Sequence, residues 1–213
     1  MKNDIFYYQN SYDIADIYDT LNIETKKLYC VMLGVSFSKK TLSRLESLLS
    51  QTESYVDKEK SWINGEVYKK HPHVTLLYGL LEGTKLTHVK KVLKGYIAPK
   101  IEIEKLDYFP DNSGKDRYMT IIAKVKVTPE LLSIHQQLSL LPHINTFKVY
   151  QPHITLGYIK PNTEFVNNLS KEKVFEVDIG KVVFDNNSGN VREVKLDDYL
   201  LTAEEVSKSI VFS

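Results

Sequence analysis

His71-Pro72-His73-Val74-Thr75-Leu76-Leu77-Tyr78 is repeated later in the chain, with small changes, as Gln151-Pro152-His153-Ile154-Thr155-Leu156-Gly157-Tyr158. Both stretches follow a Pro-His-(Val/Ile)-Thr-Leu-x-Tyr pattern. They are rich in β-branched and aromatic residues, and each has a proline at its start, which a β-strand tolerates at its first residue. The sequence therefore predicts two equivalent strands.

Each predicted strand presents a histidine and a threonine to the same side, because side chains two positions apart in an extended chain share a face. The pairs are His73 with Thr75 and His153 with Thr155. Imidazole exchanges protons near neutral pH, and a hydroxyl can hydrogen-bond a phosphoryl oxygen. Two such pairs supply an acid, a base and two phosphate-orienting groups, enough to cleave a phosphodiester bond without a metal ion. A single His-x-Thr is more often structural, but the repeat favours catalysis.

The residues around the two motifs resemble the 2H phosphoesterase superfamily, which includes the 2′-5′ RNA ligase-like proteins and cyclic phosphodiesterases. The similarity covers about residues 27–200 and is strong only around the motifs. Residues 64–66, 71–80, 141–146 and 150–160 are similar to phage members of that superfamily. Those members are the anti-CBASS cyclic-oligonucleotide hydrolases, which destroy second messengers of a bacterial defence system.

This resemblance implies that His73 and His153 form the acid-base pair and that Thr75 and Thr155 position the scissile phosphate. The implied activity is a metal-independent phosphodiesterase, without a cofactor, that hydrolyses cyclic di- and trinucleotide immune signals. An RNA-end 2′,3′-cyclic phosphodiesterase or a 2′-5′ oligonucleotide phosphodiesterase would use the same four residues. A protein that sequesters nucleotides without cutting them is the alternative from another class.

The order of predicted elements also repeats. A β-rich run over 27–37, leucines at helical spacing over 42–49 and the first motif strand are followed by a strand over 118–127, a helix from Thr128-Pro129 and the second motif strand. We therefore expect an α+β fold of two β-α-β lobes related by a pseudo-two-fold axis, with one His-x-Thr strand of each lobe facing a central cleft. Further elements are expected at 86–93, 101–109, 174–184, 191–199 and from Thr202.

Residues 1–25 are expected to form a helical N-terminal extension, and 26–213 a single bilobal domain. The 213 residues are 42% hydrophobic and 26% charged, as in an ordinary globular protein. A net charge of +1 argues against tracking of a polynucleotide and favours a small anionic ligand, without a stable nucleic-acid complex. The resemblance implies that this ligand is a cyclic oligonucleotide. The one cysteine, Cys30, lies in an apolar run and is expected to be a buried hydrophobe. A single cysteine and no membrane-length apolar run predict a cytoplasmic protein, in an infected bacterial host if a phage encodes it.

Aromatic side chains near the predicted cleft are candidates to stack on nucleobases, namely Tyr108, Tyr150 and Phe184, although an aromatic in a strand more often belongs to the core. Gly157 shares strand parity with His153 and is expected to let a ligand approach the backbone. Its neighbour Tyr158, like Tyr78 in the first motif, has the opposite parity and is expected to pack behind the site.

Metal binding is the main objection to this interpretation, since the chain has six histidines. His71 and His73 would share a strand face, but no cysteine or carboxylate cluster with familiar ligand spacing accompanies them. We therefore expect no metal site. His88, His135 and His143 lie in predicted helices or loops and are expected to be structural.

Overall fold

The computed structural model describes residues 28–58, 65–69, 71–111, 114–145, 149–186 and 191–196. Within these ranges the strands form one antiparallel sheet in the order β3-β4-β5-β2-β1-β6-β7. The strands are β1 Tyr29–Ser36, β2 His73–Leu80, β3 Ile103–Pro110, β4 Met119–Val125, β5 His153–Ile159, β6 Asp178–Asp185 and β7 Val191–Val194. The helices are α2 Lys39–Leu49, α3 Leu86–Val92, α4 Pro129–Leu138 and α5 Thr163–Leu169, with a 3₁₀ turn, η1, at Val67–Lys69.

The elements repeat along the chain as β1-α2-β2-α3-β3 and then β4-α4-β5-α5-β6. In each half the first strand pairs with the second, β1 with β2 and β4 with β5. The third strand of each half joins the other half of the sheet instead. β3 pairs with β4 of the second half, and β6 pairs with β1 of the first half. The result is a first lobe, β2-β1-β6-β7, and a second lobe, β3-β4-β5, joined by one register pair between β2 and β5, Val74 with Ile154. The predicted two-lobed α+β fold is confirmed, and the strand exchange is a feature that the sequence did not predict.

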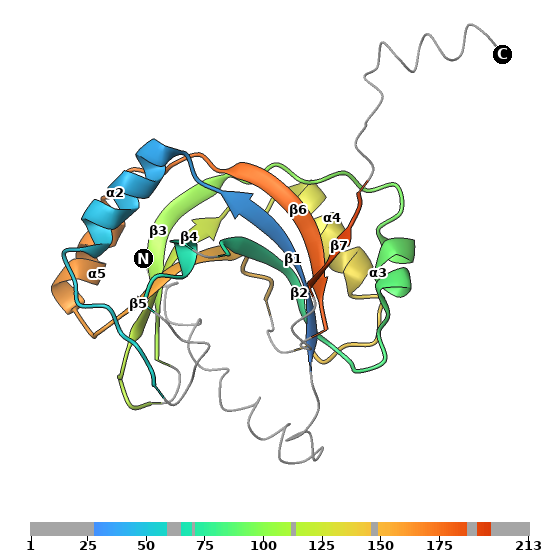
Figure 1. Cartoon of the computed structure of the whole chain (residues 1–213), viewed down its shortest axis with the longest axis horizontal. Coiled ribbons are helices and arrows are strands. Elements are labelled where there is room, and N and C mark those ends of the chain that lie inside the picture. The colour runs from blue at the N-terminus through green and yellow to red at the C-terminus, as the bar shows by residue number, and fades with distance from the viewer. Residues whose placement is uncertain are drawn as a thin grey trace, which may run out of the picture.

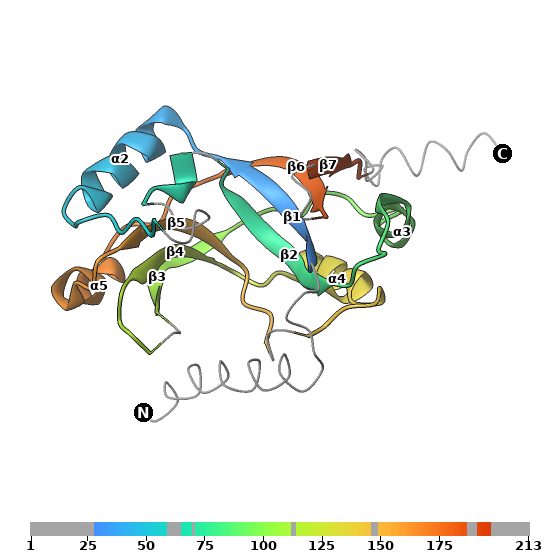
Figure 2. The same cartoon turned by 60° about the horizontal axis from the view of Figure 1, so that its bottom comes forward.

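The helices cover the two lobes at opposite ends of the molecule. Figures 1 and 2 show α2 and α5 together at one end and α3 and α4 at the other. Short polar side chains cap the N-termini of α2, which connects β1 to β2, and of α4, which connects β4 to β5. The Ser38 hydroxyl accepts the Thr41 N–H at 3.1 Å, and the Thr128 hydroxyl accepts the Leu131 N–H at 3.3 Å. The predicted helix start at Thr128-Pro129 is confirmed, whereas α5 was not predicted.

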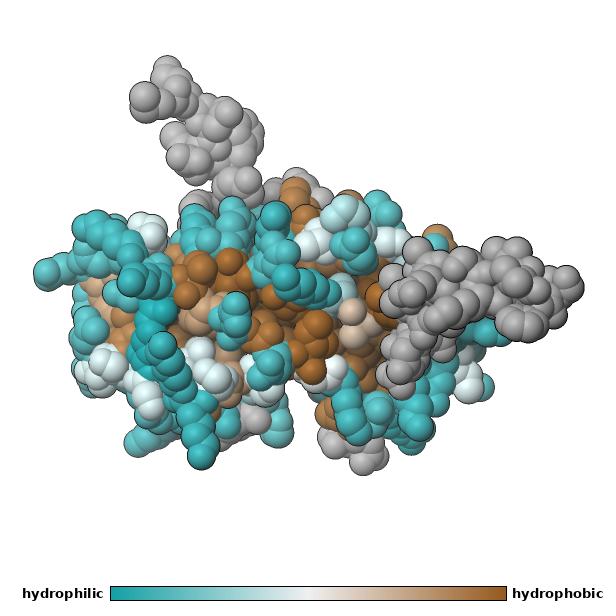
Figure 3. Space-filling model, turned by 90° about the horizontal axis from the view of Figure 1, so that it is seen from above, coloured by the Kyte–Doolittle hydropathy of each residue, from teal (hydrophilic) through white to brown (hydrophobic). Residues whose placement is uncertain are grey.

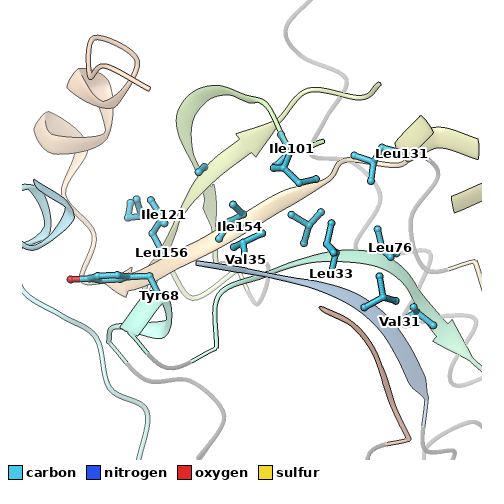
Figure 4. Close-up of a cluster of buried hydrophobic side chains, with 14 of the residues drawn as sticks. Val31, Leu33, Val35, Tyr68, Leu76, Ile101, Ile121, Leu131, Ile154 and Leu156 are labelled. Carbon is cyan, nitrogen blue, oxygen red and sulfur yellow. The ribbon is translucent and has the colours of Figure 1, made fainter. Parts of the chain in front are cut away.

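The hydrophobic core fills the side of the sheet that faces the helices. Figure 4 shows buried side chains from both lobes gathered there, among them Val31 and Leu33 of β1, Leu76 of β2 and Ile154 of β5, all less than 1% exposed. Burying each such side chain stabilises the fold by about 1.5–3 kcal/mol. Alternate residues of the same strands therefore point to the opposite side, which we call the motif face.

Polar and apolar side chains are also separated on the outer surface. From above, Figure 3 shows apolar side chains gathered along the middle of the molecule with polar side chains around them. Among the described residues no helix has the length and apolar character that crossing a membrane requires. The predicted N-terminal helix and the predicted helix from Thr202 lie outside the described residues.

Candidate active site

The two motif strands lie side by side at the junction of the lobes. Val74 and Ile154 are antiparallel register partners and both are fully buried. This register places His73 opposite Thr155 and Thr75 opposite His153, all on the motif face. Directly opposite residues have Cβ atoms about 4.5–5.5 Å apart, and diagonal ones lie about 7–8 Å apart. The four side chains therefore form a square with the histidines at one pair of diagonal corners and the threonines at the other.

Both histidines are held by the same local hydrogen bond. His73 Nδ1 lies 2.8 Å from the His71 carbonyl oxygen, and His153 Nδ1 lies 2.9 Å from the Gln151 carbonyl oxygen. A carbonyl only accepts, so each Nδ1 carries the proton and each Nε2 is the ring nitrogen left for chemistry.

The prolines explain why this hydrogen bond recurs. Pro72 and Pro152 each direct their carbonyl into the neighbouring strand, accepting the N–H of Val35 at 3.0 Å and of Val125 at 2.9 Å. The carbonyl before each proline is then available to the imidazole two residues later. The repeated Pro-His therefore fixes the orientation and tautomer of each histidine.

A β-bulge follows the threonine in both motif strands. Met32 pairs with Thr75 but Val31 pairs with Leu77, so Leu76 is an extra residue in β2. In β5, Ile122 pairs with Thr155 and Ile121 with Gly157, which leaves Leu156 as the extra residue. A bulge reverses the alternation of side chains beyond it.

The bulges correct three expectations. Tyr78 and Tyr158 do not pack behind the site, because each is turned back to the motif face; Tyr78 is 43% exposed. Gly157 does not line the site, because it now faces the core. A Cβ atom at Gly157 would lie 2.5 Å from the Gly65 carbonyl oxygen, so the glycine permits a close approach of backbone to backbone rather than of a ligand.

The aromatic candidates fall in different places. Phe184 is 3% exposed, packs edge-to-face on Tyr29 and lies on the core side, so its expected role in stacking on a base is wrong. Tyr108 is also wrong, since it pairs with the buried Ile121 and packs against the core. Its neighbour Phe109 has the motif-face parity instead and packs edge-to-face on His153, with ring centroids 5.0 Å apart.

Tyr150 lies beside the motifs but supports them from the strand edge. Its hydroxyl donates to the Thr75 carbonyl oxygen at 3.2 Å, and its ring stacks on His135 with centroids 3.9 Å apart. His135 in turn donates from Nδ1 to the Leu76 carbonyl oxygen at 2.7 Å. These contacts satisfy the carbonyls of β2 where β2 and β5 separate, so His135 has the structural role that the sequence predicted.

The surroundings of the two catalytic candidates differ. Burial lowers the pKa of His153 below its usual value, the hydrogen bond to the Gln151 carbonyl opposes this, and the nearby His73 lowers it further. Lys124 is the register partner of His153 and forms an ion pair with Glu104 at 3.2 Å. The corresponding partner of His73 is Gly34. The sequence did not lead us to predict that Lys124 lies beside His153, although a single charge inside the apolar run 121–125 was the available signal.

The Phe109→Ala substitution is expected to raise the pKa of His153, because removing the ring lets water reach the imidazole and reduces its desolvation. With His153 acting as a base, the acid limb of kcat/KM against pH lies below about 6.5 in the parent protein. It should move to higher pH in the variant. The lowered pKa of His153 also makes the free energy of unfolding depend on pH. Its contribution to stability is present in full above about pH 6.5 and is lost as pH falls through the pKa of the folded state. An unchanged acid limb, measured alongside Phe165→Ala as a core control, would contradict this account.

No group of three or more histidine, cysteine or acidic side chains within the described ranges is arranged to hold a metal ion. Two hollows in the surface also lie apart from the motifs. One lies between α2 and α5, beside Leu48 and Phe165, and the other lies between the start of α2 and residues 174–178. Neither is lined by a motif residue.

Comparisons with known proteins bear on the fold and on the family of the chain. The structure of Kluyveromyces marxianus Usb1 is similar with a TM-score of 0.57 and 9% sequence identity, covering 80% of this chain and 99% of that one. E. coli LigT complexed with phosphate gives a TM-score of 0.37 and 11% identity, covering 81% of this chain and 97% of that one. The Usb1 similarity bears on the fold alone. No curated protein sequence matches the chain.

The sequence profile of the 2′-5′ RNA ligase superfamily matches residues 43–184, which is more than half of the chain and spans both His-x-Thr motifs. The protein therefore belongs to the 2′-5′ RNA ligase superfamily of 2H phosphoesterases.

Proposed function

We propose that the protein is a metal-independent phosphodiesterase that hydrolyses cyclic di- and trinucleotide immune signals and so inactivates a bacterial anti-phage defence. The observation that supports the chemistry is the square of His73, Thr75, His153 and Thr155, with both histidines fixed in the same tautomer. The choice of substrate is supported by the similarity around the motifs to phage cyclic-oligonucleotide hydrolases.

The square suits displacement at phosphorus, because a phosphate bound over its centre would have one imidazole on either side. His153, whose lowered pKa keeps its imidazole neutral near pH 7, acts as the base and takes the proton from the attacking water or ribose 2′-hydroxyl. His73 enters the reaction as the imidazolium, with a proton on Nε2 as well as the one on Nδ1 that the His71 carbonyl accepts. As the new P–O bond forms, the opposite P–O bond breaks and His73 gives its Nε2 proton to the leaving oxygen. Thr75 and Thr155 donate their hydroxyl protons to the non-bridging oxygens, where negative charge develops.

The test is incubation with cyclic di- and trinucleotides, 2′-5′ oligoadenylate and RNA that ends in a 2′,3′-cyclic phosphate, with products identified by mass spectrometry. We expect linear products from the cyclic oligonucleotides and undiminished rates in EDTA, because protein groups supply all the proton transfers. Cleavage of the linear RNA substrates alone would overturn the proposed substrate. Abolition of all cleavage by EDTA would overturn the mechanism.

A nucleotide-sequestering protein would behave differently in one respect. It would retain its effect on signalling after both histidines are replaced by alanine, whereas an enzyme loses turnover. Retention of the effect by the His73→Ala, His153→Ala double variant would therefore replace the proposed enzyme with a binding protein.

A further inference from the structure

The backbone of β2 changes partners at Thr75. The two motif strands share one register pair, Val74 with Ile154, and then separate. On the other side of β2, the extra residue Leu76 interrupts the pairing with β1. Thr75 therefore lies between a strand separation on one side and a bulge on the other, although the proposed reaction requires its hydroxyl to be placed accurately.

Two side chains, rather than a strand, hold the backbone at this point. The Tyr150 hydroxyl donates to the Thr75 carbonyl oxygen at 3.2 Å, and His135 Nδ1 donates to the Leu76 carbonyl oxygen at 2.7 Å. The two rings are stacked, with centroids 3.9 Å apart and an interplanar angle of 9°. Burial raises the pKa of Tyr150, so its hydroxyl keeps the proton that it donates. The stack therefore presents two donors to two consecutive carbonyls of β2.

The same stretch of chain also contacts the far end of β2. The Ile144 N–H donates to the Gly79 carbonyl oxygen at 2.9 Å, and residues 80 and 143 form an isolated bridge. Tyr150 lies three positions before His153 in the sequence. Its hydroxyl therefore connects Thr75 directly to the chain that leads into the opposite catalytic histidine.

The second motif is held differently at the equivalent place. Beyond the extra residue Leu156, the Tyr158 N–H donates to the Gly65 carbonyl oxygen at 3.0 Å, and the Tyr158 carbonyl accepts the Tyr55 N–H at 2.8 Å. These hydrogen bonds join backbone to backbone. The strand of Thr155 thus depends on main-chain pairing, whereas the strand of Thr75 depends on side chains that a substitution removes one at a time.

We infer that Tyr150 and His135 are positioning residues, which hold the Thr75 hydroxyl against the phosphate by fixing the backbone beneath it. The inference rests on the proposed function and adds two residues to its active site. Neither side chain touches the substrate. Without the Tyr150 hydroxyl, the Thr75 carbonyl loses its donor and this part of β2 moves relative to β5. A displacement of that kind weakens a contact that counts most in the transition state.

The first test is Tyr150→Phe, which keeps the ring stacked on His135 and removes only the hydroxyl. With bis(p-nitrophenyl) phosphate as the substrate, we expect kcat to fall by about 10-fold and KM to change by less than about 2-fold, because Thr75 acts on charge that develops in the transition state. Tyr96→Phe is the matched control, since the Tyr96 hydroxyl also contacts a side chain, the Ser133 hydroxyl at 3.4 Å, but follows α3. It should leave kcat unchanged. An unchanged kcat in Tyr150→Phe would overturn the inference.

Double variants show whether the effect passes through Thr75. Thr75→Val removes the threonine hydroxyl but keeps the carbonyl to which Tyr150 donates. In this background Tyr150→Phe should lower kcat no further, whereas in a Thr155→Val background it should still lower kcat by about 10-fold. Equal losses in the two backgrounds would show a general loosening of the fold and would contradict a positioning role.

His135 is tested by restoring its donor without its ring. The side-chain nitrogen of asparagine is the same number of bonds from the backbone as Nδ1 of histidine, so His135→Asn keeps a donor for the Leu76 carbonyl, and His135→Leu does not. We expect His135→Leu to lower kcat by about as much as Tyr150→Phe, and His135→Asn to recover most of that loss. Equal losses in the two variants would exclude His135 as a positioning residue.

A measurement without turnover separates this inference from the proposed function. The γ-methyl NMR signals of ¹³C-labelled threonine are followed while inorganic phosphate is added to the full chain. We expect phosphate to shift the Thr75 and Thr155 signals in the parent protein, and the Thr75 shift to fall to less than about half in Tyr150→Phe. An undiminished Thr75 shift in the variant, or no shift of either signal in the parent, would overturn the inference. If the signals behave as expected but cyclic oligonucleotides are not cleaved, the proposed function fails and the positioning role stands.

Discussion

Alanine at either His73 or His153 is expected to lower kcat/KM by about 10²–10⁴-fold, the contribution typical of one positioned proton transfer. The double variant should lose little more than the worse single variant, because residues that act as a unit are not additive. The two losses should also differ with the leaving group. A p-nitrophenyl diester leaves without a proton, so activity on it should survive His73→Ala better than His153→Ala.

His143 provides a matched control within the chain. It also follows a proline, and its Nδ1 lies 2.9 Å from the Leu141 carbonyl oxygen two residues back. It belongs to no His-x-Thr pair, however, and lies in a segment that pairs with Leu80 at the far end of β2. His143→Ala should therefore retain activity. A loss equal to that of His73→Ala would show that the local Pro-His structure, rather than the acid-base pair, accounts for the effect.

The Gly157→Ala substitution is expected to destabilise the fold by about 2–4 kcal/mol, from overpacking together with an unpaired backbone group. The added Cβ would lie 2.5 Å from the Gly65 carbonyl oxygen, which accepts the Tyr158 N–H at 3.0 Å. Relieving the contact requires the two backbones to separate and breaks that hydrogen bond. For a chain of this size the midpoint of thermal unfolding should fall by about 5–15 °C.

Gly34→Ala is the comparison variant for this prediction. Its Cβ would lie 3.3 Å from the Lys181 carbonyl oxygen, which a small shift relieves, so the midpoint should fall by much less. Leu77 occupies the bulge position in β2 that Gly157 occupies in β5 and carries a full, buried side chain. The bulge itself thus tolerates side chains. If the two glycine variants unfold at the same temperature, the contact with Gly65 is not what requires glycine at position 157.

The sequence predicted the parts of the molecule that depend on local pattern. Period-two alternation and the repeated Pro-His-x-Thr predicted β2, β5 and the shared face of His73 and Thr75, while Thr128-Pro129 predicted the start of α4. These features depend on neighbours along the chain. Such information is present in a single sequence.

The predictions that were wrong concern which face of the sheet a side chain lies on, and this depends on pairing between distant segments. The extra residues Leu76 and Leu156 are defined only against β1 and β4, so the reversal of parity that moves Tyr78 and Gly157 could not be derived from alternation alone. The same holds for Phe109 and Tyr108, whose faces are set by the pairing of β3 with β4. An error of one position places a strand residue on the wrong side of the sheet.

The exchange of β3 and β6 has a consequence for folding and for the rigidity of the site. Met32 pairs with Val183, across most of the length of the chain, so the first lobe is complete only after the second half has been made. Contacts between residues so far apart in sequence slow folding, because a large loop must close before they stabilise the structure. In return, neither half is an independent unit that can swing on a hinge. The spacing of the two imidazoles is set by a sheet that both halves of the chain must complete together.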